Sequence, residues 1–590
     1  MKKIAYILTA ALAFGTLVTS CDDMLEEKNY GNQTTADMMS NEQNVVLLVG
    51  QIYADLKYTH DHWGYWGLQT ITADEGICVP RNSGADWNDG GYWMKQNTHE
   101  WNHRGDAIEN VWNITISNAV LCNKIINTLQ TYKENMAEDV YKAYLGEAEV
   151  LRCYYFYQLF DCFGRIPYTE KFEEVTGALL EPEEVWSNLV AVLERNAPNM
   201  QVANDGNRAT LYGRTTQGFA YALLARLYIN AESYGCTPEN VFKTVEKPES
   251  FSGSFYDNCI RCCDNVIQSG AYSIESNYFT NFKIKNENSR ENIFVIVEDG
   301  REEGERSTTG AHSCMNKLRI AHNTMHYGVQ FAYDMPLDTW NGFCARPEFL
   351  ELYKGNDVRG VGYEKDGTHN KKDWGWFVGP VYKKGSNDYY VDTKQIDDDH
   401  PSGTPTVIVS DIKNIRNASN MEGARLNKWE LDKSGDGLYK YEENDFPIMR
   451  YADVLWMKEE AIKRGGVGAS EMGSADFQKL IARSFAYDKG AETFKAEYGD
   501  PASWTLKDIL DERGREFTWE MIRRRDLIRF GEFGNIQYVR DCSNASARAE
   551  IRKWFPIPFS VLQKSLRDEN GNPIWTQTPG YENLDRKSVV

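Results

Sequence analysis

Six of the sixteen tryptophans in this chain fall within one stretch of fifty residues: Trp63, Trp66, Trp87, Trp93, Trp101 and Trp112. The first five lie in a polar stretch without helical periodicity, so an apolar helix face does not account for them. Aromatic rings stack on the C–H faces of sugars, while neighbouring carboxylates, amides and guanidinium groups bind the hydroxyls. The cluster therefore favours a carbohydrate-binding surface, in which some rings contact the ligand and the others pack the loop.

Polar groups suited to sugar hydroxyls are interleaved with these tryptophans, and a second loop-rich stretch near residue 340 again combines Trp with Arg. The candidate glycan-binding residues are Trp63, Trp66, Asp74, Arg81, Asp86, Trp87, Trp93, Trp340 and Arg346. Trp112 falls inside a predicted helix, where packing is the expected role. Separation along the chain does not give geometry, so the sequence leaves open which tryptophans converge.

The segment His99-Glu100-Trp101-Asn102-His103 matches HExxH, in which two histidines one helical turn apart bind zinc and the glutamate activates water. That chemistry requires the motif to lie inside a helix. Here the flanking residues are poor helix formers, and Asp106 has the character of an N-cap for the next helix. We therefore predict no zinc site in this segment.

A second pattern has the spacing of a calcium loop. Asp432, Ser434, Asp436 and Glu443 supply oxygen ligands at positions 1, 3, 5 and 12, with Gly437 at position 6. No obvious helix precedes it, and Lys440 adds a positive charge. A solvated turn is the preferred interpretation and structural calcium the alternative. No other cofactor or metal is expected.

Glu512, Glu516 and Glu520 could be taken for the carboxylate pair of a glycoside hydrolase. On a helix, however, they form an i, i+4 stripe flanked by arginines, which is typical of a salt-bridged packing face. The chain also has no G-x-S-x-G, P-loop or dinucleotide fingerprint. We therefore predict a binding protein and not an enzyme.

The N-terminus has the features of a processing signal. Lys2 and Lys3 precede an apolar run, 4–18, that is too short to cross a bilayer. The run ends in Leu17-Val18-Thr19-Ser20-Cys21, which resembles the bacterial lipobox, where the cysteine is acylated. The expected organisation is a signal peptide over 1–20, lipidation at Cys21, a flexible tether to residue 35, and one body over 36–590.

Helical periodicity dominates that body, with helices predicted over 44–58, 107–132, 137–163, 182–198, 215–234, 256–268, 448–463, 475–487 and 506–530. They group into helical units at about 40–58, 107–270 and 446–530. Consecutive pairs of this length predict tetratricopeptide-like hairpins, although the strict repeat signature is missing. The segments 59–105 and 290–445 are loop-rich, with a short strand at 292–297, and irregular segments of this length usually carry function. The predicted fold is mainly α, with helical hairpins supporting long irregular loops and short strands.

Asp and Glu (86) outnumber Lys and Arg (65), giving a net charge of −21. So acidic a chain repels phosphate backbones, which argues against nucleic acid as a partner. Twelve cysteines less the acylated one leave an odd number, so at least one thiol is free or pairs with another chain.

Several segments also occur in the order of one known family. They are 83–91 with 99–101, 147–160 closed by 163–167, 446–457 with 460–461, 512–517 and 524–530, and 555–558 followed by 572–573 and 578–581. Together with Asp22 and Asp23 directly after Cys21, they resemble the SusD/RagB family of outer-membrane nutrient-binding lipoproteins.

This resemblance implies a SusD-like helical body, a glycan site on irregular loops, and docking as a lid on a SusC-like TonB-dependent transporter. The protein would be lipid-anchored in the outer membrane, face the cell exterior and deliver oligosaccharides to that transporter. The resemblance does not identify the ligand, because the binding loops vary between members of the family. The alternatives are peptide binding on the same scaffold, as in RagB-like members, a surface glycan hydrolase, and a purely structural scaffold.

Overall fold

The computed structural model describes residues 35–83, 87–173, 177–298, 320–328, 339–361, 374–431, 443–534 and 550–582. Cys21, Asp86, Asp432, Ser434 and Asp436 fall outside these ranges. The lipid anchor and the calcium loop, of which only Glu443 is described, therefore remain predictions.

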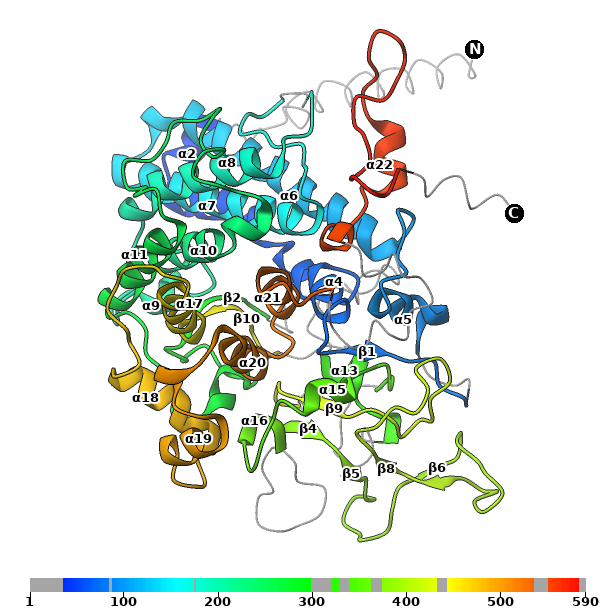
Figure 1. Ribbon diagram of the computed structural model, residues 1–590. Coiled ribbons are helices and arrows are strands. Elements are labelled where there is room, and N and C mark those ends of the chain that lie inside the picture. The colour runs from blue at the N-terminus through cyan, green and yellow to red at the C-terminus, as the bar shows by residue number, and fades with distance from the viewer. Residues whose placement is uncertain are drawn as a thin grey trace, which may run out of the picture.

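Long helices form one side of the molecule, at the upper left of Figure 1. α6 (Asp106–Thr131) and α7 (Glu138–Phe163) pack against each other as a hairpin, because the short connection between them forces them to be antiparallel neighbours. The stack continues through α8 (Pro182–Asn196), α10 (Gln217–Ile229), α11 (Phe255–Gln268) and α17 (Tyr451–Lys463), each packed on its neighbours. The predicted mainly α fold is confirmed, and the helix bounds agree closely with the periodicity.

Local sequence sets these helix ends. α8 begins with Pro182 at its first position and a capping box between Glu181 and Glu184, so the free backbone N–H groups are satisfied from within the first turn. The side chains of Thr216 and Ser254 cap α10 and α11 by accepting from backbone N–H groups three residues on.

The remaining helices are shorter: α2 (Thr35–Met39), α3 (Glu42–Gly50), α4 (Tyr65–Ile71), α5 (Tyr92–Asn97), α9 (Arg208–Leu211), α13 (Ile320–Thr324), α15 (Pro347–Leu350), α16 (Val358–Val361), α18 (Ala475–Ala482), α19 (Ala491–Tyr498), α20 (Leu506–Glu516), α21 (Arg523–Arg529) and α22 (Phe559–Lys564). The helix predicted over 44–58 ends at Gly50 and continues as 3-10 turns. α4 and α5 lie within the segment predicted to be irregular.

The single helix predicted over 506–530 is wrong. The structure has two helices, α20 and α21, separated by Trp519 (φ 59°) and Met521 (φ 63°). Left-handed backbone cannot continue a right-handed helix. The break is held by tertiary contacts, because the backbone N–H of Trp519 donates to Glu75 Oε2 at 2.8 Å and its indole N–H donates to the Glu75 carbonyl at 3.0 Å.

All five described sheets are antiparallel two-stranded ladders: β1 (Ile77–Cys78) with β3 (Phe343–Cys344), β2 (Asn292–Ile296) with β10 (Phe446–Arg450), β4 (Gly375–Phe377) with β9 (Arg425–Asn427), β5 (Gly379–Pro380) with β8 (Val407–Ile408), and β6 (Val391–Asp392) with β7 (Thr404–Pro405). β2 confirms the strand predicted at 292–297. β10 occupies the start of the segment predicted as helix 448–463. In Figure 1 most of these short strands gather at the lower right, below α4 and α5.

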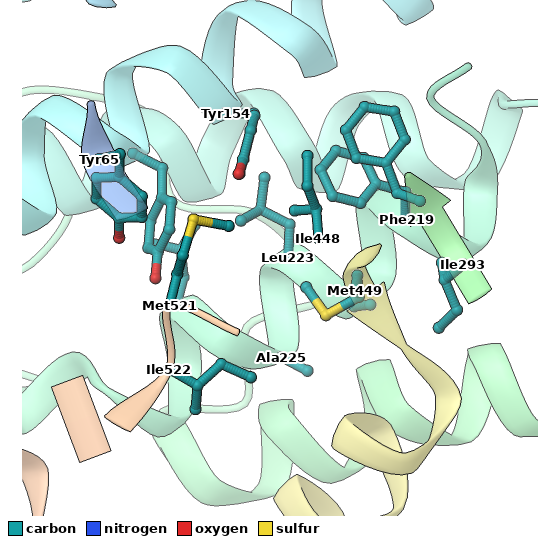
Figure 2. Packing of buried hydrophobic residues seen from close by; sticks show 14 of the residues in the cluster. Tyr65, Tyr154, Phe219, Leu223, Ala225, Ile293, Ile448, Met449, Met521 and Ile522 are labelled. Atoms are coloured by element: carbon teal, nitrogen blue, oxygen red, sulfur yellow. The ribbon is translucent and has the colours of Figure 1, made fainter. Parts of the chain in front are cut away.

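The hydrophobic core joins helices to the β2–β10 pair. Figure 2 shows Phe219 and Leu223 of α10 close to Ile448 and Met449 of β10, with Ile293 of β2 beside them, and all five are buried. A set of buried ion pairs also lies in the interior of the protein. Glu516 contacts Arg450 at 2.9 Å, Arg483 at 2.6 Å and Arg359 at 3.1 Å, and all four side chains are buried. The predicted salt bridges of Glu512, Glu516 and Glu520 to arginines are confirmed. The predicted stripe on one helix is wrong, because α20 ends at Glu516 and Glu520 lies beyond it.

Candidate functional site

Trp87 and Trp340 come together where the two loop-rich segments meet. The β1–β3 ladder pairs Cys78 with Phe343, and the backbone N–H of Trp87 donates to the Trp340 carbonyl at 3.4 Å. The ring centroids of the two tryptophans are 5.6 Å apart with an interplanar angle of 40°, and both side chains are half-buried. Each of the two residues is therefore partly open to solvent.

Buried aromatic rings form the floor beneath this pair. Phe343 lies edge-on to Trp87 at 5.0 Å, and His62 does so at 5.1 Å. Gly342 lies so close to the indole of Trp87 that a Cβ there would overlap its ring. The orientation of Trp87 is therefore fixed by packing, which is what a preorganised binding surface requires.

Trp63 and Tyr92 extend the same aromatic cluster. The half-buried Trp63 ring lies 5.3 Å from Tyr92 and 5.1 Å from the buried Trp93. The Tyr92 hydroxyl accepts from the Ala107 backbone N–H at 3.1 Å, which holds the ring against the start of α6. Tyr92 is not among the residues that the sequence predicts for the site, and its position next to Trp93 is the signal that points to it. Hereafter "the aromatic surface" means Trp63, Trp87, Tyr92 and Trp340.

Trp66 and Trp93 belong to the core. Trp66 is 1% exposed and its indole N–H donates to the Trp519 carbonyl at 2.9 Å. Trp93 is 0% exposed and its indole N–H donates to Asp89 Oδ2 at 2.9 Å. Neither ring can stack on a ligand in this structure, so both are assigned to packing beneath the aromatic surface.

The predicted polar residues have partners elsewhere. Asp74 pairs with Arg523 of α21 through two contacts of 2.8 Å. The buried Arg81 donates to the carbonyls of Ser419 (2.7 Å) and Glu422 (2.6 Å). Arg346 is also buried and donates to Asn97 Oδ1 at 3.3 Å. These side chains support the loops, and the hydrogen bonds named here go to groups other than Trp87 and Trp340.

The HExxH segment lies between α5 and α6, outside either helix, as predicted. His99 has φ 58°, its Nε2 lies 3.0 Å from the Thr72 carbonyl, and its ring stacks on Phe533. The His103 ring stacks on Phe559. Both histidines therefore pack against aromatic side chains from other parts of the chain. Among the described residues, no three or more His, Cys, Asp and Glu side chains are grouped to hold a metal ion.

Two family models match this chain. One is described as starch-binding associating with outer membrane and covers residues 23–229, and the other is described as the SusD family and covers residues 290–581. The chain belongs to the SusD family. No helix in the described part of this SusD-family chain is long and apolar enough to cross a membrane.

Known proteins of similar sequence or fold agree with this membership. The starch-binding protein SusD of Bacteroides thetaiotaomicron is 23% identical over 463 residues, which covers 74% of this SusD-family chain and 72% of the relative. Surface glycan-binding protein A from Bacteroides thetaiotaomicron, solved in complex with laminarihexaose, matches with a TM-score of 0.63 at 18% identity, covering 91% of this chain and 99% of that one. NanU of B. fragilis matches with a TM-score of 0.64 at 18% identity, covering 94% and 100%. At such identities the structural matches show the fold.

Proposed function

We propose that this protein captures oligosaccharides at the cell surface and delivers them to a SusC-like TonB-dependent transporter. The observation that carries the proposal is the Trp87–Trp340 pair, in which two half-buried rings from distant loops lie side by side over a buried aromatic floor. Each ring held in this way offers an apolar face to a sugar, and little side-chain freedom is lost on binding.

The relatives support the ligand class. SusD is named for starch binding, and a protein of the same fold was solved with laminarihexaose. Glucans are therefore the first ligands to test.

Binding without hydrolysis is part of the proposal. Glu512 and Glu516 are buried and paired with Arg359, at 2.7 Å and 3.1 Å, so neither is available to a substrate. Anchoring through an acylated Cys21 in the outer membrane, with the body facing the exterior, would place the aromatic surface where polysaccharides are met.

Affinity electrophoresis of the purified protein against starch, laminarin and a wider polysaccharide panel tests this function, with the same mixtures assayed for new reducing ends. We expect retardation by one glycan class, no released product, and loss of retardation in Trp87→Ala. The matched control is Trp575→Ala, which removes another half-buried tryptophan whose indole donates to the Gly177 carbonyl. New reducing ends would favour a hydrolase, and binding of peptides but no glycan would favour the RagB-like alternative.

A further inference from the structure

A polar cavity lies on the other side of the β1–β3 ladder from the aromatic surface. Its volume is about 270 Å³, and its walls are the segment directly after β3 and the loop 411–416. Phe343 of β3 contacts Trp87, whereas its neighbour Cys344 packs in the separate apolar cluster that Ile412 and Ile415 cover. Successive strand residues point to opposite faces, so the cavity and the aromatic surface are separate sites.

Three cations line this cavity, although the whole chain carries a net charge of −21. They are Arg346, Lys413 and Arg416, and two carboxylates, Glu348 and Asp411, line the cavity with them. Arg416 also lies 3.6 Å from Glu100. Arg346 is only 2% exposed and lies 3.6 Å from Glu348, so one cation is fixed in the wall beside its own counter-ion. Lys413 is exposed and has no ion-pair partner in the part of the chain that the structure describes.

The loop that carries Lys413 is held in place by buried groups. Arg81 donates to two carbonyls of the segment that follows the loop, those of Ser419 and Glu422. The Lys413 backbone N–H in turn donates to Glu422 Oε2 at 3.1 Å. The cavity wall is therefore tied to β1 through Arg81, which gives this buried arginine a positioning role.

The lining chemistry fits an acidic sugar better than a simple anion. Lys413, together with the Arg416 N–H groups that do not face Glu100, can bind a carboxylate. Asp411 and Asn414 offer acceptors and an amide for hydroxyls. Pro347, Ile412 and Ile415 add apolar walls for the C–H faces of a sugar ring. A phosphate ion would gain nothing from these apolar walls, whereas a sugar ring would. The volume is close to the lower end of ordinary ligand pockets, ~300 Å³, which suits a single sugar unit and not a chain.

We propose that this cavity binds one carboxylate-bearing sugar unit, such as a uronate, and so selects acidic glycans as cargo. The inference rests on the proposed glycan-binding function and adds to it a charged subsite apart from the aromatic surface.

The test is isothermal titration of the purified protein with galacturonate, glucuronate and N-acetylneuraminate, each compared with its own methyl ester. The ester keeps the ring and removes the charge. We expect at least one acid to bind about tenfold more tightly than its ester, because hydrogen bonds to a charged group are worth that much. Replacing two exposed cations, in the double variant Lys413→Gln with Arg416→Gln, should weaken binding of that acid by about tenfold or more.

Two controls separate this site from the aromatic surface. Lys383→Gln changes an exposed lysine outside the cavity and should leave binding of the acid unchanged. Trp87→Ala should abolish retention on a neutral glycan but leave binding of the monosaccharide acid unchanged. Loss of the proposed glycan-binding function can therefore be distinguished from loss of acid binding in the cavity. The inference is overturned if no acid binds, if acid and ester bind equally, or if the double variant binds like the wild type. Equal competition by acetate or inorganic phosphate would reassign the cavity to simple anions.

Discussion

The ring centroids of Trp87 and Trp340 lie 5.6 Å apart, although the two residues are far apart in the chain. Trp87 follows β1, and Trp340 shortly precedes β3, the strand that pairs with β1. Two rings at this distance act as one surface for a sugar chain.

We expect Trp87→Ala and Trp340→Ala each to cost about 2 kcal/mol or more of binding free energy, as hot-spot aromatics do. Because they serve one ligand, the double variant should lose less than the sum of the two, as measured by titration with the glycan that the affinity gels identify. A loss in the double variant equal to the sum of the two single losses of binding free energy would contradict a shared site. Trp340→Phe, which keeps an aromatic ring, should bind the glycan more tightly than Trp340→Ala.

Gly342 offers a way to disturb Trp87 without touching a polar group. A methyl group at this position would overlap the Trp87 ring, so Gly342→Ala must displace the indole or the backbone beside it. Overpacking of this kind costs about 1–3 kcal/mol of stability. We expect weaker glycan retention together with a changed tryptophan fluorescence spectrum. Gly473→Ala is the control, because nothing lies within 4 Å of the added methyl group. Unchanged retention in folded Gly342→Ala would mean that the Trp87 orientation does not matter.

Trp66→Ala should separate packing from binding among the tryptophans. Trp66 is 1% exposed and packs edge-on against Trp519, the residue at the break between α20 and α21. Its truncation should lower the free energy of unfolding by about 3–5 kcal/mol, measured by urea denaturation. Glycan affinity of the protein that remains folded should stay within about twofold of wild type. A selective loss of glycan affinity with little loss of stability would show that Trp66 contributes to ligand binding.

Acid should destabilise the protein through Glu291. Burial raises the pKa of this carboxyl, but Arg483 and Arg450 outweigh burial and lower it from 4.5 to about 2. A folded-state pKa below the unfolded value contributes stability that is complete above about pH 4.5 and is lost as the pH falls towards 2. The contribution is on the order of 3 kcal/mol. Urea unfolding between pH 5 and pH 3 should therefore show a steeper loss for the wild type than for Glu291→Gln, and equal slopes would refute the assignment.

Asp445 should have the opposite pH dependence. Burial is the main cause that raises the pKa of its carboxyl to about 7, against the lowering effect of hydrogen bonds from the Tyr212 hydroxyl and the Glu298 backbone N–H. The fold thus favours the neutral acid, and stability from this site is lost as the pH rises from about 4 through 7.

Asp445→Asn, which is neutral at every pH, should therefore gain stability relative to wild type as the pH is raised from 5 to 8. The control is Asp453→Asn. Burial opposes ionisation of Asp453, but Arg513 and Arg226 keep the pKa of its carboxyl below the usual value, so its replacement should destabilise at both pH values. A flat difference between Asp445→Asn and wild type would show that Asp445 does not titrate in this range.

Local sequence was sufficient for most of the helical body. Periodicity and capping residues act within a few positions of each other, so α6, α7, α8 and α11 could be predicted to within about two residues from the chain alone. The break between α20 and α21 could not, because the hydrogen bonds that hold Trp519 come from Glu75, far away in the chain.

The sequence by itself determined the family, the helical framework and the tryptophan-rich loop as the expected binding surface, because composition and spacing are properties of the chain. Tertiary structure alone decided that Trp87 and Trp340 share a half-open surface while Trp66 and Trp93 are buried. All four residues have the same chemistry and similar polar surroundings in the sequence. Their exposure depends on the β1–β3 ladder and the aromatic floor, which form only when segments more than two hundred residues apart pair with each other.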